Sequence, residues 1–279
     1  MLLTRVLTAL ALLPVVLGML FFSNPALWSL FVLGIALLAC WEWSRMCEFT
    51  PGGQAAYLAA SGVIGGFLWL LYLRWVPGDF RAAAVTGFIL ATAFWVFFAP
   101  YWLARKLRPS PSLRGVAGWL AAWPAWLALV VLRDASPWLL LALAALVWVA
   151  DIAAYFAGKR FGRHKLAPAV SPGKTWEGVA GGLLGVALYG AALAWLANGR
   201  ETPISPFFAT GAGVPAILAM LALVGVSIVG DLFESWMKRG VGLKDSSGLL
   251  PGHGGVLDRI DALTSSLPVA AFALTLART

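Results

Sequence analysis

Nine long apolar runs constrain this chain more than any other feature of its sequence. They lie near residues 6–23, 26–44, 55–73, 82–104, 115–132, 136–158, 177–197, 212–234 and 261–277. Most are close to the length of about 20 helical residues that crosses the hydrocarbon core of a bilayer. Segments such as PWLLLALAALVWVA (137–150) are apolar on every face, which disfavours the alternating pattern of a transmembrane barrel. We therefore predict an all-α polytopic integral membrane protein with about nine transmembrane helices, the last being the shortest.

The composition supports this class. Hydrophobic residues make up 61% of the chain and charged residues 11%, whereas charged residues are about 25% of a soluble domain. Arg5 before an apolar run also resembles a signal peptide, but the run is long and no clear small-x-small cleavage site precedes SNPALW. We expect residues 1–23 to remain as a helix. Cys40 and Cys47 are expected to be packing residues, because no metal-ligand spacing or disulfide framework is present.

The basic residues fall unevenly on the two sides of the predicted spans. Fifteen of the 20 lie on the side of the N-terminus: Arg5, Arg45, Arg105, Lys106, Arg108, Arg114, Lys159, Arg160, Arg163, Lys165, Lys174, Lys238, Arg239, Lys244 and Arg259. Because such residues accumulate in cytoplasmic loops, we predict a cytoplasmic N-terminus and cytoplasmic loops at 159–176 and 235–260. The net charge of +8 favours anionic headgroups or phosphorylated substrates over nucleic acid, since the cations flank the membrane.

The acidic residues divide the chain into two parts. Eight of the 12 lie between residues 151 and 261. Residues 1–135 are therefore predicted to form an N-terminal scaffold of transmembrane helices, and residues 136–279 a C-terminal catalytic half with a polar site facing the cytoplasm. No internal repeat is visible.

Asp231 lies where an apolar helix is predicted to run into charged sequence. In LALVGVSIVGDLFESWMKRG, Asp231, Glu234 and Lys238 are spaced to share one helical face, and Ser227 is one turn earlier. A carboxylate near the membrane is costly unless it meets a cation, water or a partner charge, so Asp231 is a functional candidate. The alternative is an ordinary interfacial aspartate paired with Lys238.

A second pair of carboxylates follows in HGGVLDRID. If a helix begins near Val256, Asp258 and Asp261 share one face of its first turn. Capping a helix explains one of them but not both. Together with Asp231 they have the composition of a Mg²⁺ site, and the glycine-rich segment 252–255 lets the backbone approach a ligand closely.

The other polar residues near these carboxylates have more than one interpretation. His253 is suited to orienting a phosphate, moving a proton or hydrogen-bonding across its loop. Lys238, Arg239 and Lys244 are typical either of topology determinants at a membrane or of a specific phosphate site, and their place between two carboxylate sets favours the phosphate site.

A third polar segment covers residues 151–178. Its GKT triplet is not a nucleotide-binding P-loop, because Pro168 stands where that motif needs glycine and no strand precedes it. We instead predict a Ser-Pro-Gly turn that presents Ser171, Lys174 and Thr175 before a helix with Glu177 in its first turn. Such a place is suited to holding phosphate.

Asp151 precedes this basic segment by one or two helical turns. It is a candidate for the same site, and the alternative is a buried aspartate hydrogen-bonded to Tyr155.

These residues resemble a known family. Ser235, Lys238-Arg239, Lys244-Asp245 and PGHGGVLDRID (251–261) are similar to the signature of the phosphatidate cytidylyltransferase, or CDP-diacylglycerol synthase, family. The blocks DIAAYFAGKRFGRHKLAP (151–168) and SPGKTWEG (171–178) also resemble that family. The signature match spans 27 residues, whereas the N-terminal half agrees only in hydropathy.

The resemblance implies a nucleotidyltransferase of phospholipid biosynthesis that converts CTP and phosphatidate to CDP-diacylglycerol and pyrophosphate. It implies a homodimer, and Mg²⁺ with a second cation such as K⁺. The compact chain with short loops indicates a multi-pass protein of a bacterial inner membrane. Asp231, Asp258 and Asp261 would form the metal site. The catalytic set would be Asp231, Asp258, Asp261, Lys238 and His253. Substrate would be bound by Asp151, Ser171, Lys174, Thr175, Glu177, Ser235, Arg239, Lys244, Asp245 and Arg259.

Three other functions are weighed against this one. A transporter or channel would place charges near the bilayer midplane, often on inverted repeats, and neither feature is present. A CDP-alcohol phosphotransferase would carry a DG..AR motif, which is absent. A CTP-using lipid kinase remains an alternative that substrate competition would separate.

Overall fold

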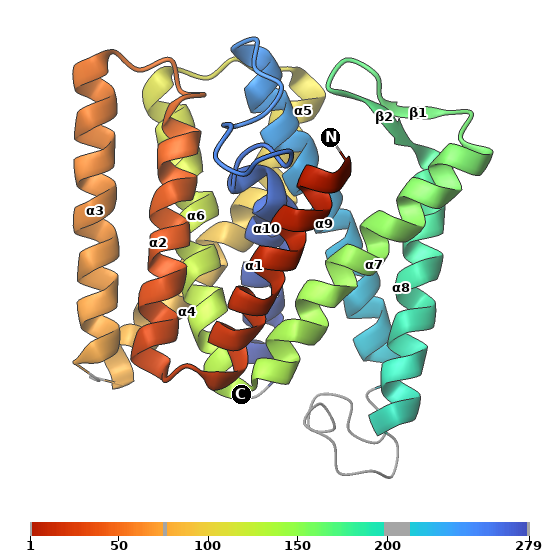
Figure 1. Cartoon of the computed structure of the whole chain (residues 1–279), viewed down its shortest axis with the longest axis horizontal. Coiled ribbons are helices and arrows are strands. Elements are labelled where there is room, and N and C mark those ends of the chain that lie inside the picture. Colours follow the sequence, from red (N-terminus) through yellow and green to blue (C-terminus); the bar gives the residue numbers. More distant parts are fainter. Residues whose placement is uncertain (1, 75–76, 198–212, 278–279) are drawn as a thin grey trace.

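The computed structural model describes residues 2–74, 77–197 and 213–277, and of residues 2–5, 77 and 213 it describes the backbone alone. Among the 20 basic residues, Arg200, Arg278 and the side chain of Arg5 therefore lie outside the described part. Within it, every predicted apolar run falls on helix, and the helices form one bundle (Figure 1).

The helices follow the apolar runs closely. They are α1 (Leu2–Phe22), α2 (Pro25–Ser44), α3 (Pro51–Leu73), α4 (Pro77–Ala93), α5 (Ala99–Arg105), α6 (Pro111–Ala135), α7 (Pro137–Phe161), α8 (Trp176–Ala197), α9 (Gly213–Gly240) and α10 (Leu257–Leu276). Seven described stretches are long and apolar enough to cross a membrane: Pro25–Ser44, Pro51–Leu73, Gly78–Arg105, Pro111–Ala135, Pro137–Phe161, Trp176–Ala197 and Val214–Gly240. A polytopic helical membrane protein is confirmed, while the count of nine spans and the side of the N-terminus stay predictions.

Proline sets the first residue of many of these helices. Pro25, Pro51, Pro111 and Pro137 each follow a side chain that caps the helix, respectively Asn24, Thr50, Ser110 and Ser136. Proline suits the first helical position because its missing N–H would have no partner there, and the capping oxygen accepts from a free amide of the first turn. The short connections between apolar runs thus fix where the helices begin.

The run from 78 to 105 is helical but not uniform. A π-helix, η1 (Phe94–Phe98), separates α4 from α5. Pro100 lies two residues after its end, and a proline inside a helix removes one backbone hydrogen bond and crowds the preceding turn. A local π-helix accommodates that disruption.

Helix α10 joins several helices of the bundle, because it packs against α9, α6 and α4. Large side chains such as Trp126 and Phe233 are fully buried among these helices. Cys40 and Cys47 are buried free thiols, which confirms that they are packing residues.

Small residues let α8 lie close against α7. A methyl group added at Gly178 would reach within 3.0 Å of the Ala154 carbonyl oxygen, and one at Gly185 would lie 2.7 Å from the Ala153 Cβ. Membrane helices commonly approach through such glycine and alanine faces. This close packing fixes the position of the segment that joins the two helices.

That joining segment is a two-stranded antiparallel hairpin of β1 (Lys165–Ala167) and β2 (Ser171–Thr175). The prediction of a turn beginning at Ser171 was wrong: Ala167 pairs with Ser171 and Lys165 with Thr175, so the turn lies at 168–170. In Figure 1 the hairpin lies at the same end of the bundle as the segment between α9 and α10. This end carries the candidate site.

Candidate functional site

A cavity beside the hairpin gathers five of the predicted site residues. It has a volume of about 430 Å³ and is bounded by α7, β2, the start of α8, and α9. We call it the Lys174 cavity. Its lining includes Asp151, Ser171, Lys174, Thr175 and Asp231, together with Tyr155 and Lys159. Residues that are 80 positions apart in sequence therefore face one space.

Asp231 is paired in this cavity, but not with its predicted alternative partner. The Lys174 ammonium nitrogen lies 2.5 Å from Asp231 Oδ2, and the Ser235 hydroxyl donates to Oδ1 at 3.3 Å. The pairing with Lys238 that the helical spacing suggested is wrong, because Lys238 has two other carboxylate partners. Asp151 also interacts electrostatically with Lys174 and with Asp231.

Lys238 is enclosed rather than presented to solvent. Its ammonium group donates to Glu234 Oε2 at 2.7 Å and to Asp258 Oδ1 at 2.5 Å, and its side chain is only 9% exposed. The interaction with Glu234 follows from the i, i+4 spacing on α9, whereas that with Asp258 joins α9 to α10. Lys238 therefore fixes the two helices that carry the acidic residues.

The Asp258 carboxylate accepts hydrogen bonds from several donors. Besides Lys238, its carboxylate accepts from the Ser246 amide and hydroxyl and from the Gly255 amide, at 2.7 to 3.2 Å. Burial alone would raise the pKa of Asp258, but the Lys238 ammonium and the Gly255 and Ser246 amides outweigh it and hold that pKa below its ordinary value. Asp258 is thus ionised and ties the loop before α10 to α9.

Asp261 has much less compensation for its charge. Its Oδ1 accepts from the Ala262 amide at 2.7 Å. The like charge of Asp231 acts on it unfavourably, whereas a side-chain hydrogen bond with Glu234 and the charge of Lys238 act favourably. Asp231, Glu234 and Asp261 therefore form a cluster of neighbouring carboxylates, two of which are paired with lysines: Asp231 with Lys174 and Glu234 with Lys238.

This cluster fits a divalent cation in part. Among the described residues, no three His, Cys, Asp or Glu side chains are placed to hold a metal by themselves. Mg²⁺ is commonly held by one or two carboxylates, with substrate phosphates and water supplying the other ligands. Asp231 and Asp261 supply carboxylates for such a site, and of the two only Asp231 is paired with a lysine in the described part of the chain. Asp258, with its oxygens already accepting hydrogen bonds, fits less well.

Glu42 is a site residue that the sequence interpretation assigned to the scaffold. It is fully buried. Its carboxylate accepts from the Ser246 and Ser247 hydroxyls and from the Val256 and Leu257 amides. It therefore caps the start of α10 from the N-terminal half. An acidic residue at the end of an otherwise apolar run was the signal that could have identified it.

The remaining predicted residues lie around this centre. Glu177 does not line the Lys174 cavity: it accepts from the backbone amide of His164 at 3.2 Å and lies 2.7 Å from its Nδ1, which ties α8 to the hairpin. His253 Nδ1 is buried without a hydrogen-bond partner in the described part of the chain. The side chains of Arg239, Lys244, Asp245 and Arg259 are exposed near the same end.

The start of α10 confirms one local prediction. The helix begins at Leu257, with Val256 at its N-cap position. Asp258 and Asp261 therefore lie one turn apart at its start. Gly254 before it has a φ of 81°, and a side chain there would also meet Asp258, so glycine is required at that position.

Comparison with known proteins finds relatives that match nearly the whole chain. A family model described as the cytidylyltransferase family matches residues 3–277. The phosphatidate cytidylyltransferase of Pseudomonas aeruginosa is 42% identical over 277 residues, covering 97% of this chain and 96% of the relative. The protein of that name from Haemophilus influenzae is 34% identical, covering 96% of each chain. That from Brucella suis is 35% identical over 275 residues, covering 94% of this chain and 89% of the relative.

Proposed function

We infer the function from the fact that this chain belongs to the cytidylyltransferase family. It is a nucleotidyltransferase that reacts CTP with phosphatidate, giving CDP-diacylglycerol and pyrophosphate. The observation that carries this conclusion is 42% identity across 97% of the chain to a phosphatidate cytidylyltransferase. A transporter or channel is not favoured.

The proposed reaction requires compensation of phosphate charge more than activation of a nucleophile. The nucleophile is a phosphate oxygen of phosphatidate, which is already ionised near neutral pH and needs no strong general base. It forms a bond to the α-phosphorus of CTP, while the bond from that phosphorus to the bridging oxygen breaks and pyrophosphate leaves. The main obstacle is repulsion between two polyanions, so positioning and compensation of charge supply most of the catalysis.

We propose that the Lys174 cavity receives the phosphate of phosphatidate. Lys159 lies on the wall of that cavity and is available to a phosphate there, and Lys174, which is paired with Asp231, is the second cation of the same space. Ser171 and Thr175 line the same space and are positioned on β2. Lys244, Arg239 and Arg259 are exposed at the same end and are proposed to neutralise the phosphates of either substrate.

Asp231 and Asp261 are proposed to hold Mg²⁺, with Asp258 as the less well fitted third member of the set. When bound, the ion would neutralise phosphate charge and stabilise the departing pyrophosphate. The protein's own contribution is to hold the acidic residues in place: Lys238 and the Ser246 amide orient Asp258, and the packing of α10 against α9 orients Asp261. A second cation such as K⁺ is part of the same proposal.

We further propose that the site faces the cytoplasm of a bacterial inner membrane. The concentration of Lys and Arg at this end of the bundle supports this orientation, and CTP would reach the site from that side.

The test uses purified protein in detergent with phosphatidate, Mg²⁺ and CTP labelled separately on the α- or γ-phosphorus. We expect α-label to become lipid-soluble in an amount equal to the pyrophosphate released, and γ-label to remain in pyrophosphate. A lipid kinase would instead transfer the γ-label, with diacylglycerol as its acceptor.

The lipid acceptor provides the control. Replacing phosphatidate with diacylglycerol should abolish both products, because diacylglycerol lacks the attacking phosphate. Folded protein that releases no pyrophosphate, or that labels diacylglycerol from the γ-position, would refute the assignment.

A further inference from the structure

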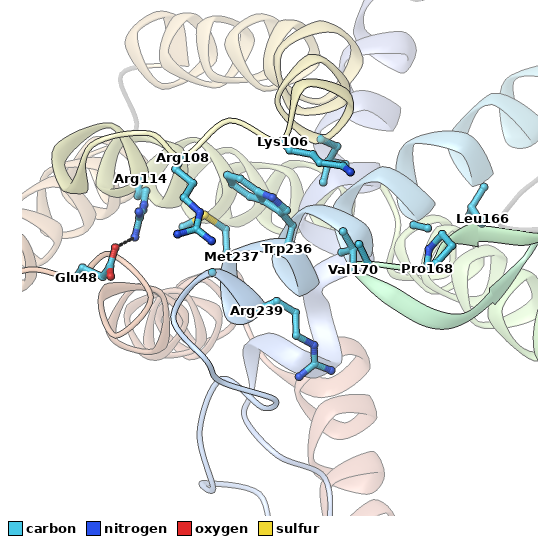
Figure 2. Close-up of a pocket in the computed structure, with 14 residues that line it drawn as sticks. Glu48, Lys106, Arg108, Arg114, Leu166, Pro168, Val170, Trp236, Met237 and Arg239 are labelled. Atoms are coloured by element: carbon cyan, nitrogen blue, oxygen red, sulfur yellow. Dashed lines mark hydrogen bonds and ion pairs between the residues drawn. The ribbon is translucent and has the colours of Figure 1, made fainter.

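A second, larger cavity lies on the other side of the hairpin. Its volume is about 560 Å³, and Leu166 of β1 lines both this cavity and the Lys174 cavity. We call it the Arg108 cavity. Figure 2 shows side chains that surround it, from the segment between α5 and α6, from the end of α9 and from the hairpin. The two cavities therefore adjoin at the hairpin and along α9, and of the two only the Lys174 cavity is lined by α7 and α8.

The Arg108 cavity is strongly basic. Four cations line it, Lys106, Arg108, Arg114 and Arg239, against a single carboxylate, Glu48. Arg114 uses that carboxylate as its partner and also bonds the Pro109 carbonyl.

The other cations have no acidic partner. The side chains of Lys106 and Arg108 make no hydrogen bond or ion pair with any other described residue, and the Arg239 guanidinium donates to the Leu243 carbonyl oxygen. Three cations without a carboxylate partner around one concave space indicate that an anionic ligand binds there.

The apolar part of the lining suggests more than a bare phosphate. Trp236, Leu103 and Pro168 lie on the walls, and Figure 2 shows the Trp236 ring between Lys106 and Arg108. An indole and guanidinium groups are suited to contact the flat face of a nucleobase. The cavity therefore combines groups that recognise phosphates with a surface that suits a base.

We propose that the Arg108 cavity binds CTP, with Lys106, Arg108 and Arg239 on its triphosphate, while phosphatidate occupies the Lys174 cavity. This inference rests on the proposed function, which requires two phosphorylated substrates to meet. The hairpin between the cavities then separates the two polyanions until their reacting groups approach each other. The residues new to the site are Lys106 and Arg108, which the sequence interpretation treated only as topology determinants.

The surroundings of each cavity favour this division of substrates. The Lys174 cavity lies beside α7, where Tyr155 is 61% exposed and Ile152 and Phe156 are also exposed along an apolar span. Acyl chains can lie against such a surface while the headgroup enters the cavity. The Arg108 cavity is instead bounded largely by segments between the spans, 106–108 and 166–170, where a water-soluble substrate arrives.

The test measures steady-state kinetics of the Lys106→Gln/Arg108→Gln double variant. We expect the KM for CTP to rise about tenfold or more, because charge-assisted hydrogen bonds to phosphate are lost. The kcat at saturating CTP and the KM for phosphatidate should stay within about twofold of wild type. The matched control is Arg105→Gln/Arg160→Gln, which removes the same charge from exposed residues that line neither cavity.

Each outcome decides the proposal. A rise in the KM for CTP in the double variant but not in the control supports it. Equal kinetics in the two variants would overturn it, and a rise only in the KM for phosphatidate would show that the cavity takes the lipid. Binding of CTP with Mg²⁺ by calorimetry, in the absence of lipid, should weaken in parallel, and an unchanged affinity would also overturn it. Wild-type protein without turnover would refute the proposed function instead.

Discussion

Asp258 and Asp261 stand three residues apart on α10, yet the protein compensates their charges to different extents. Asp258 accepts hydrogen bonds from Lys238, Ser246 and Gly255. Asp261 accepts one from the neighbouring Ala262 amide and is repelled by the Asp231 carboxylate. A folded protein retains uncompensated buried charge mainly where function requires it. Asp258 therefore stabilises the site, whereas Asp261 is available to a ligand.

The Asp261→Asn substitution tests this difference. Removing the charge should lower kcat by about 100-fold or more, because the proposed metal ligand is lost. Stability should not fall, since the substitution also relieves repulsion from Asp231. The measurements are turnover across a Mg²⁺ titration and the Tm of the purified protein.

Asp258→Asn is the matched comparison on the same helix. Its new amide group would face the Ser246 and Gly255 donors, so we expect a loss of about 2–3 kcal/mol and a Tm lower by about 5–10 °C. Near wild-type turnover of Asp261→Asn at saturating Mg²⁺ would refute the metal role. A Tm that falls equally in both variants would mean that both residues are structural.

Among the helices, α2 and α10 are joined by Glu42, although the sequence assigns them to separate halves of the chain. Glu42 lies at the end of α2 and accepts hydrogen bonds from the segment that leads into α10. Arg45 adds a hydrogen bond from its guanidinium to the Ser246 carbonyl oxygen at 2.7 Å. The N-terminal helices therefore position the acidic end of α10 as well as supporting the bundle.

Replacing Glu42 with Gln should affect both stability and catalysis. The amide would present an NH₂ group to donors that now share a carboxylate, and we expect a loss of about 2–3 kcal/mol. The kcat should fall while the KM values for CTP and phosphatidate change little, because Glu42 positions α10 without lining either cavity.

Asp79→Asn is the control, since Asp79 is exposed at the start of α4. Substitution of an exposed residue is expected to change stability by no more than about 0.5 kcal/mol. If Glu42→Gln matched this control in both Tm and kcat, the positioning role would be wrong.

The elements differ in how well the sequence predicts them. Apolar runs located the helices, because this signal acts within one segment. The hairpin was missed because β1 has three residues and depends on pairing with β2. The sequence also failed to predict that Asp231 pairs with Lys174 and that Glu42 caps α10. Each contact joins residues that are dozens of positions apart, and spacing within one helix cannot predict such a contact.

At the scale of the whole molecule, the polar features gather at one end of the bundle. The hairpin and the segment between α9 and α10 lie there, and Figure 1 places the N-terminal end of α1 nearby. The Thr8 hydroxyl donates to the Pro251 carbonyl oxygen at 3.0 Å, which ties α1 to that segment. The start of α4 lies at the opposite end of the bundle in the same view. Both cavities therefore lie at the same end of the bundle, and we expect them on the same side of the membrane.

Labelling of single introduced cysteines determines which side that is. The native Cys40 and Cys47 are fully buried, so they should give little background with a membrane-impermeant maleimide. We expect Lys165→Cys on the hairpin to be labelled in inverted membrane vesicles but not in intact spheroplasts. Asp79→Cys, at the other end of the bundle, should show the reverse pattern, because basic residues concentrate on the cytoplasmic side. The opposite pattern at both positions would invert the topology, and CTP would then lack access to its proposed cavity from the cytoplasm.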